Sequence, residues 1–536
     1  GYRTSLPNLF PTESAIAAAD DSQRNESIHH HHHEIPLSVD EGEYESHSHP
    51  SDNNKNEYSM DEYDAMDGRS KPAKGRIWMD PETSLEKRVG RFVNQPLGSM
   101  HHLDIKLTSI DLIRECGKLN SFEGMKNAQE ILDRLIEEKK YVNESEESRS
   151  SSSSSSSMSL VVIPDRPFQM VMYGWANMCQ NVKIAPQRMR EVLELMIEES
   201  DYDKTMRKAV GASRRKTTPG SNTDGSDDTD GSDDTTPDDL FEGLSCEPTV
   251  DTYNTLLQGL SQAAARSIQA AIEAEHVLKI MDKANRNRGW HTKPNTRSYS
   301  LVLNAYAKSR HATAGDRAES VLRTMIERHE CEKDEYLEEH GVEYKYEYEY
   351  EYDDDTLFDP EDTNRRKIVT PDTIAYTTVI QAHGNSDSPD SAGKALALLN
   401  ELICSENPLL EPDAFAFANT INAYSKMAAQ KKSPRDRLEA AECAEDILWT
   451  MVDEMKDRKD PGRLTGSIVP FNACLNAWAQ SFAAESPHRA EDLLHRMLDP
   501  ELQEIAGIHP DTVSFNTCMQ AWAKACKKFE ETAAPE

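Results

Sequence analysis

The feature that most constrains this chain is a short pattern that occurs seven times. It consists of an aromatic residue, a small residue six places later, and a large residue immediately after that, as in Phe471, Ala477 and Trp478. The aromatic positions of the seven copies are Phe168, Tyr253, Tyr299, Tyr376, Phe417, Phe471 and Phe515. Three matching columns in seven copies are strong evidence for internal repetition, which predicts a fold built from one unit used many times.

A second pattern follows each of the first six copies and predicts the other half of the unit. Its spacing is A-x-x-x-L-x-x-M, as in AESVLRTM from Ala318 and AEDLLHRM from Ala490, and it begins 19 to 27 residues after the aromatic. Positions i, i+4 and i+7 form one apolar stripe of a helix, so each unit is expected to be an antiparallel helical hairpin. Because a hairpin cannot cover its own stripe, we expect an all-α fold, an α-solenoid of stacked helical hairpins.

Composition divides the chain into repeats and acidic tracts. The 536 residues include 60 Lys and Arg against 95 Asp and Glu, and three tracts (1–100, 201–245 and 331–370) carry −23 of the formal net charge of −35. Such sequence buries too little apolar surface to offset its conformational entropy, so we expect disorder there. The predicted organisation is a disordered acidic region at 1–100, a first helical hairpin at 103–140, a Ser-rich linker at 141–160, and a repeat array at 161–530 with disordered insertions at 201–245 and 331–370.

These repeats resemble the pentatricopeptide repeat family. The resemblance covers residues 160–530 and rests on helix entries such as PDTVSFNT from Pro510 and VDTYNTLL from Val250, together with the AExxLxxM second helices. The family binds single-stranded RNA at about one base per repeat, read by the residue after the aromatic and the last residue before the next repeat. The base-reading candidates that the resemblance implies are Gln169, Asn254, Asn295, Ser300, Asp372, Thr377, Asp413, Asn472, Asp511 and Asn516.

Some of these candidates form pairs with an implied base preference. The family's pairing rules imply cytosine for Asn254 with Asn295, guanine for Thr377 with Asp413, and uracil for Asn472 with Asp511. An alternative for Asp372, Asp413 and Asp511 is that they are helix-entry carboxylates, which favour the positive end of a helix.

The resemblance also implies a column that sandwiches the bases, two residues before the aromatic. This column reads Arg166, Asp251, Arg297, Ile374, Phe415, Val469 and Val513. The last four side chains are apolar and suit stacking on a base. Arg297 could stack as well, because a guanidinium is planar, whereas Asp251 does not suit the role.

A further column lies nine residues after the aromatic and contains no acidic residue. It consists of three lysines and four amides: Lys308, Lys426, Lys524, Asn177, Gln262, Asn385 and Gln480. The resemblance places this column beside the phosphate backbone of RNA, and a stripe of lysine and amide donors suits that position. The alternative is an ordinary solvated helix end, where the helix dipole favours lysine.

We expect no catalytic activity, and we assign no metal site, cofactor or small-molecule substrate. The nine cysteines contain no CxxC pair, which indicates reduced thiols of an intracellular compartment rather than a disulfide framework. Cys474 and Cys518 fall three residues after an aromatic, on the inward face of a first helix, where a thiol is an inert core group. The run His29–His33 is interpreted as an unstructured homopolymer or a purification tag rather than a metal site.

The remaining expectations concern partners and location. No run of about 18 apolar residues occurs, so no membrane-spanning helix is predicted. The alternative to RNA binding is a protein-binding helical scaffold whose acidic loops contact basic partners. The chain begins at Gly1 and stops before a second helix of the seventh repeat, so we expect sequence to be missing at both ends. The family resemblance implies that the protein is located in a mitochondrion or a plastid.

Overall fold

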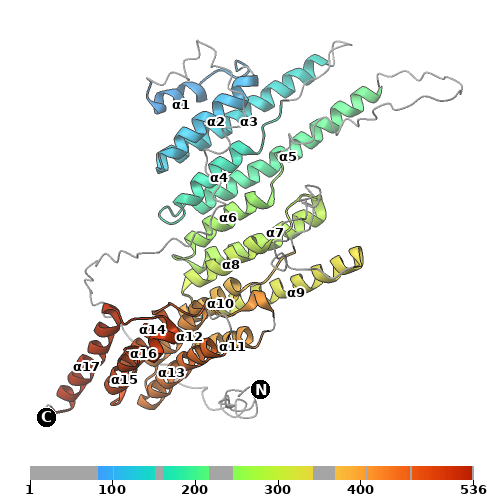
Figure 1. The fold of residues 1–536 in the computed structure, drawn as a ribbon. Coiled ribbons are helices and arrows are strands. Elements are labelled where there is room, and N and C mark those ends of the chain that lie inside the picture. Colours follow the sequence, from blue (N-terminus) through green and yellow to red (C-terminus); the bar gives the residue numbers. More distant parts are fainter. Residues whose placement is uncertain are drawn as a thin grey trace, which may run out of the picture. The chain divides into compact units, whose positions relative to one another are not determined.

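The computed structural model describes residues 83–100, 102–150, 161–216, 246–341, 368–405, 407–458 and 462–533. Within these ranges the chain is helical and has no strand, as expected for an all-α protein (Figure 1). All of these ranges fall in one unit of the chain, Gly75–Glu536. The run His29–His33 and most of the acidic tracts predicted to be disordered lie outside the described residues.

Each aromatic of the repeat pattern lies near the start of one helix, and the helix that follows carries the second pattern. The first helices are α4 (Arg166–Met178), α6 (Val250–Ala263), α8 (Thr296–Ser309), α10 (Thr373–Asn385), α12 (Ala414–Gln430), α14 (Val469–Ser481) and α17 (Thr512–Ala533). The second helices are α5 (Ala185–Lys216), α7 (Ile268–Arg288), α9 (Ala314–His340), α11 (Ser391–Cys404), α13 (Pro434–Asp457) and α15 (Ser486–Met497). The other elements are α1 (Leu85–Val93), the pair α2 (His102–Lys118) and α3 (Phe122–Ser150), η6 (Pro408–Leu410) and α16 (Pro500–Ala506).

The helices pack in the pairs that the repeat pattern predicts. Each first helix from α4 to α14 packs on its own second helix and also on the first helix of the next pair, so that α10 contacts α8, α11 and α12. The aromatic residue is buried in the first six copies of the pattern. Phe515 in the seventh copy is 43% exposed, since no second helix follows α17 within the described residues.

The small residue of the pattern allows a first helix to approach the preceding second helix closely. A Cβ atom on Gly259 of α6 would lie 2.6 Å from Met189 Sδ on α5 and 3.1 Å from Cys179 Sγ. Gly174 of α4 faces Met125 of α3 in the same way. Contact between consecutive pairs therefore depends on this column as well as on the aromatic one.

A pair of glycine substitutions tests this close packing. Gly315 of α9 lies against the buried imidazole of His383, and a Cβ atom there would lie 2.8 Å from His383 Cγ. We expect Gly315→Ala to lower the free energy of unfolding by about 1–3 kcal/mol, because the buried ring has no room to move aside. Gly393→Ala in α11, where a Cβ atom would meet nothing within 4 Å, should stabilise the protein by about 0.5–1 kcal/mol. Chemical denaturation measures both, and effects of the same sign would contradict this expectation.

Three helices, α3 and the second helices α5 and α9, run further than the acidic and Ser-rich composition predicts. The residues that are helical instead of linker or disordered insertion are 141–150 of α3, 201–216 of α5 and 331–340 of α9. The acidic region predicted at 1–100 also ends early, because α1 forms and buries Val89 and Phe92. These helix extensions are polar, yet they carry side chains that hold the chain where it returns from each insertion.

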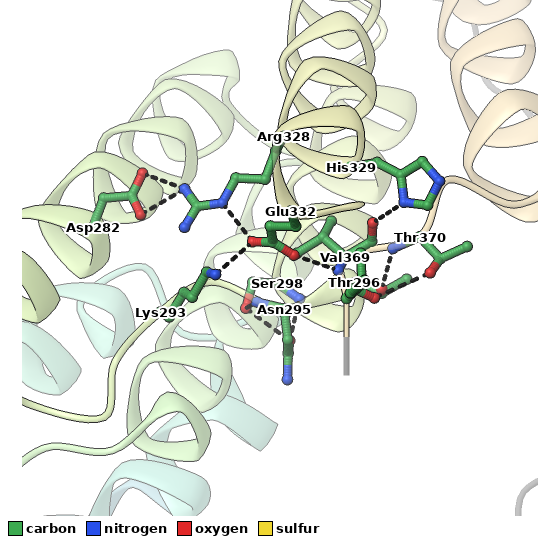
Figure 2. Close-up of polar contacts among 11 residues, drawn as sticks. Asp282, Lys293, Asn295, Thr296, Ser298, Arg328, His329, Glu332, Val369 and Thr370 are labelled. Carbon is green, nitrogen blue, oxygen red and sulfur yellow. Dashed lines mark hydrogen bonds and ion pairs between the residues drawn. The ribbon is translucent and has the colours of Figure 1, made fainter. Parts of the chain in front are cut away.

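The chain that follows residues 342–367 is held by α9 at Val369 (Figure 2). The backbone N–H of Val369 donates to Glu332 Oε2 at 2.8 Å, and its carbonyl oxygen lies 2.8 Å from His329 Nδ1. Glu332 is buried and also pairs with Lys293 and Arg328, each at 2.9 Å. Burial opposes ionisation of Glu332, but these contacts outweigh it and hold the pKa of the carboxyl below its ordinary value. Helix α10 begins at Thr373, four residues after Val369, so this contact holds the segment that leads into α10.

Two further contacts hold the chain in a similar way where it continues after residues 151–160 and after residues 217–245. Asn143 of α3 exchanges two hydrogen bonds with the backbone of Val161, at 3.0 and 3.1 Å. On α5, Asp203 Oδ2 accepts a hydrogen bond from Cys246 Sγ at 3.9 Å. Asp203 Oδ1 forms an ion pair with Nζ of the buried Lys139 at 2.6 Å. We call the three contacts Asn143–Val161, Asp203–Cys246 and Glu332–Val369 the insertion anchors.

Candidate nucleic-acid interface

The residue that precedes the helix caps five of the seven first helices, α6, α8, α10, α12 and α17, whereas Asp165 before α4 and Ile468 before α14 make no side-chain cap. Asn295, Asp372 and Asp413 have extended backbones, and each side chain accepts a hydrogen bond from the backbone N–H three residues on. Asp511 accepts the equivalent bond from Ser514 N at 2.9 Å. These N–H groups have no partner inside the helix, so each cap contributes about 1 kcal/mol. The helix-entry alternative for the three aspartates is therefore confirmed.

Three of the caps also bond to a predicted base-reading residue on the preceding first helix. The donor and acceptor pairs are Asn254 Nδ2 to Asn295 Oδ1 at 3.5 Å, Thr377 Oγ1 to Asp413 Oδ1 at 3.4 Å, and Asn472 Nδ2 to Asp511 Oδ1 at 3.2 Å. These are long hydrogen bonds, which a competing ligand could replace. The structure thus joins the two members of each pair for which the sequence implies a specific base.

The other base-reading candidates have local contacts. Gln169 Nε2 donates to Asp165 Oδ2 at 2.7 Å, and Ser300 Oγ donates to the carbonyl oxygen of Thr296 at 2.9 Å. Asn516 is exposed on α17. Hydrogen bonds between paired columns are therefore found at three junctions between first helices within the described residues.

The carboxylates of the cap column differ in their electrostatic environment. Burial raises the pKa of Asp372 and of Asp413 above the ordinary value. Burial also opposes ionisation of Asp511, but hydrogen bonds from Ser514 and Asn472 outweigh it and hold the pKa of Asp511 below the ordinary value. Because Asp511 is exposed as well, it is the cap best placed to accept a hydrogen bond from a ligand.

Four apolar side chains lie exposed beside the cap column. They are Ile374, Phe415, Val469 and Val513, with exposed fractions between 44% for Val469 and 66% for Ile374. They occupy the same position on α10, α12, α14 and α17, which pack in that order. All four are the side chains selected from the sequence as suited to stacking on a base. Apolar side chains aligned in water beside polar pairs are typical of a binding surface, and we call these four the apolar stripe.

The predicted phosphate-contact lysines have partners that the sequence did not indicate. Lys426 Nζ of α12 donates to the carbonyl oxygen of Asn385 at 2.8 Å, at the end of α10, and pairs with Asp387 at 2.7 Å. Asn385 itself donates to the carbonyl oxygen of Ala307 in α8 at 2.8 Å. The last carbonyl groups of a helix lack partners within it, so this column caps the end of the preceding first helix.

Lys524 repeats this arrangement on α17. Its Nζ donates to the carbonyl oxygen of Ala479 at 3.2 Å and to Gln480 Oε1 at 3.0 Å, at the end of α14. The helix-end alternative thus accounts for the contacts of Lys426 and Lys524, although the helix end belongs to the neighbouring repeat. Lys308, the third lysine, is exposed at the end of α8.

Two serines that were not selected from the sequence complete the polar junctions. Ser298 Oγ lies 2.7 Å from Asn254 Oδ1, and Ser514 Oγ lies 2.7 Å from Asn472 Oδ1. Both serines are buried and occupy the third position of their helix. A signal was present in the sequence, because a short polar residue three places after a cap can return a hydrogen bond to the backbone of the cap. Ser298 does so with Asn295 N, at 3.2 Å.

Several cysteine side chains fit the role of core groups, whereas Cys331, Cys404 and Cys526 are exposed. Cys474 and Cys518 are buried, as predicted, and burial raises the pKa of both thiols. Burial also raises the pKa of Cys179 and Cys246, in each case to about 12. A thiol that stays protonated is a poor nucleophile.

The fold and the site together define a class: an all-α protein of paired helices whose first helices carry a polar column beside an apolar stripe. Compared with protein-family models, curated proteins and solved structures, the chain has no match. The described residues contain no group of three or more His, Cys, Asp or Glu that could hold a metal ion. Nor is any helix in the described part of the chain both long and apolar enough to cross a membrane.

Proposed function

We propose that this chain is an α-solenoid of the pentatricopeptide type that binds single-stranded RNA and acts, without catalysing a reaction, in RNA processing, stability or translation. The observation that carries the proposal is the coincidence of two columns. Three polar pairs bridge successive first helices, and exposed apolar side chains stand two residues after two of the caps that form them, Asp413 and Asp511. A base needs both kinds of contact, hydrogen bonds along its edge and an apolar surface against its face.

The chemistry of each pair suits the edge of a base. Asn472 supplies amide donors and an acceptor, and the ionised Asp511 supplies acceptors only. Thr377 with Asp413 offers a hydroxyl and a carboxyl group in place of the amide. Pairs of different composition at successive junctions would present different donor and acceptor patterns, which is what base selection along a single strand requires.

Binding is expected to depend weakly on salt, because few cations are free to contact phosphates. Lys426 and Lys524 are engaged with helix ends, and Lys426 also with Asp387, which leaves Lys308 and Arg297 as exposed cations among the described side chains of the first helices. With two or three phosphate contacts, the affinity should fall roughly 5- to 20-fold between about 50 and 200 mM salt.

Selection from a random RNA pool, followed by fluorescence anisotropy with a labelled selected RNA at both salt concentrations, tests the proposal. Single-stranded DNA of the same sequence and the RNA in duplex form are the controls, and both should bind more weakly. If the pool yields no enriched sequence, the proposal fails. A salt dependence of a thousandfold or more would indicate non-specific phosphate binding instead of base reading.

A second candidate function is a helical scaffold that binds basic proteins. The observation that favours it is the net charge of −35, together with the neutralisation of Lys426 by Asp387. A fluorescent Lys- and Arg-rich peptide distinguishes the two functions. The scaffold should bind this peptide with a steep salt dependence, whereas a protein that only binds RNA should not bind it.

A further inference from the structure

The junction between α14 and α17 holds the Asn472 amide in one orientation. Asn472 Nδ2 donates to Asp511 Oδ1 at 3.2 Å, and Ser514 Oγ donates to Asn472 Oδ1 at 2.7 Å. A carboxylate only accepts hydrogen bonds, so the nitrogen of the amide must face Asp511. If the amide were turned over, its oxygen would meet the carboxylate, and the bond from Ser514 would be lost.

Asn254 is held in the same way at the junction between α6 and α8. Its Nδ2 donates to Asn295 Oδ1 at 3.5 Å, while Ser298 Oγ lies 2.7 Å from its Oδ1. Only 3% of Asn254 is exposed, whereas Asn472 is half-buried and its partner Asp511 is exposed. The junction at Asn472 is therefore the more accessible of the two.

A first helix has serine at its third position where the preceding first helix has asparagine in the base-reading column. The junctions with Asn254 and Asn472 have Ser298 and Ser514 at the third position of the following helix. The junctions in which the base-reading residue carries a hydroxyl group, Ser300 and Thr377, have Ala375 and Ala416 there instead. A hydroxyl group rotates freely to suit its partner and has no orientation to fix, whereas an amide does.

We infer that Ser514 and Ser298 are positioning residues that, together with the caps Asp511 and Asn295, hold the Asn472 and Asn254 amides in one orientation and so set the base preference of their junctions. This inference rests on the proposed function. With its orientation fixed, Asn472 keeps one free N–H and one lone pair on Oδ1, and Asp511 Oδ2 remains an acceptor. The free N–H of Asn472 beside the acceptor Oδ2 of Asp511 complements a carbonyl oxygen beside the ring N–H of uracil, whereas cytosine has no N–H at that ring position. A rotated amide would exchange donor and acceptor and lose this selectivity.

Ser514→Ala tests the inference, with Ser514→Thr as the matched variant that keeps the hydroxyl group. In anisotropy titrations with the RNA selected by the wild-type protein, we expect Ser514→Ala to reduce the preference for uracil over cytosine at one nucleotide by about tenfold. The affinity for the best RNA should fall less than about threefold, because stacking is unchanged. Ser514→Thr should keep the wild-type preference.

A measurement without RNA separates positioning from simple capping. In protein labelled with ¹⁵N-asparagine, the two side-chain N–H signals of Asn472 should be distinct and slow to exchange in the wild type, and averaged or faster to exchange in Ser514→Ala. Asn472→Asp identifies these signals by their disappearance. Equally ordered Asn472 amides in both proteins would overturn the inference.

The two possible failures are distinguishable. A wild-type protein that enriches no RNA would overturn the proposed function, and this inference with it. If the wild type enriches RNA and Ser514→Ala loses thermal stability but keeps the uracil preference, Ser514 is a helix cap only, and the inference alone fails.

Discussion

Replacing Lys139 with methionine is expected to lower the free energy of unfolding by about 3–5 kcal/mol. The side chain of Lys139 is fully buried and pairs with Glu199 at 2.9 Å and with Asp203 at 2.6 Å, which are themselves almost inaccessible. Methionine keeps the volume of lysine, but it leaves two buried carboxylates without the cation between them. Denaturation with urea, followed by circular dichroism, gives the change directly.

The neighbouring Lys140 is the control for this substitution. It pairs with the same Glu199 at 2.7 Å, but 41% of its side chain is exposed. Solvent screens such a pair, so Lys140→Met should cost less than about 1 kcal/mol. Equal losses for the two variants would show that burial of the charges is not what makes Lys139 important.

Phe415→Ala is expected to weaken RNA binding roughly 5- to 150-fold, equivalent to about 1–3 kcal/mol for the loss of one stacked base. Phe415 is the aromatic member of the apolar stripe, and its ring is largely in water. Because the ring packs against little of the protein, the free energy of unfolding should change by no more than about 0.5 kcal/mol. Anisotropy titrations with the selected RNA measure the affinity.

A matched control for Phe415 is Leu337, which is exposed to a similar degree on the second helix α9. Leu337→Ala should leave RNA affinity unchanged, and Phe415→Trp should keep or improve it, because tryptophan offers a larger stacking face. If Leu337→Ala weakens binding as much as Phe415→Ala does, the apolar stripe is not the RNA-binding surface.

The helices, the packed columns and the apolar stripe could be predicted because they depend on local periodicity. The spacing that buries Phe417 under its second helix also places Phe415, two residues earlier, on the opposite side of the same helix. The position of each cap follows from the same register. A repeat sequence therefore fixes both the inward and the outward face of its first helix.

The insertion anchors could not be predicted, because their partners are distant in sequence. Glu332 and Val369 are 37 residues apart, and Asp203 and Cys246 are 43 apart. Composition counts these residues as charge in an acidic stretch, whereas in the fold they are buried partners that extend α5 and α9. The contact of Lys426 with the end of α10 was not predicted for a related reason, since its acceptor is a backbone carbonyl group and no side-chain pattern indicates it.

The insertion anchors have an evolutionary consequence. Closing a loop costs only about 0.6 kcal/mol more for each doubling of its length. A hydrogen bond to a charged group, such as that from Val369 N to Glu332, contributes about 1.5–3 kcal/mol and offsets several doublings. We therefore expect changes in length between residues 342 and 367 to leave the register of α8, α9 and α10 unchanged.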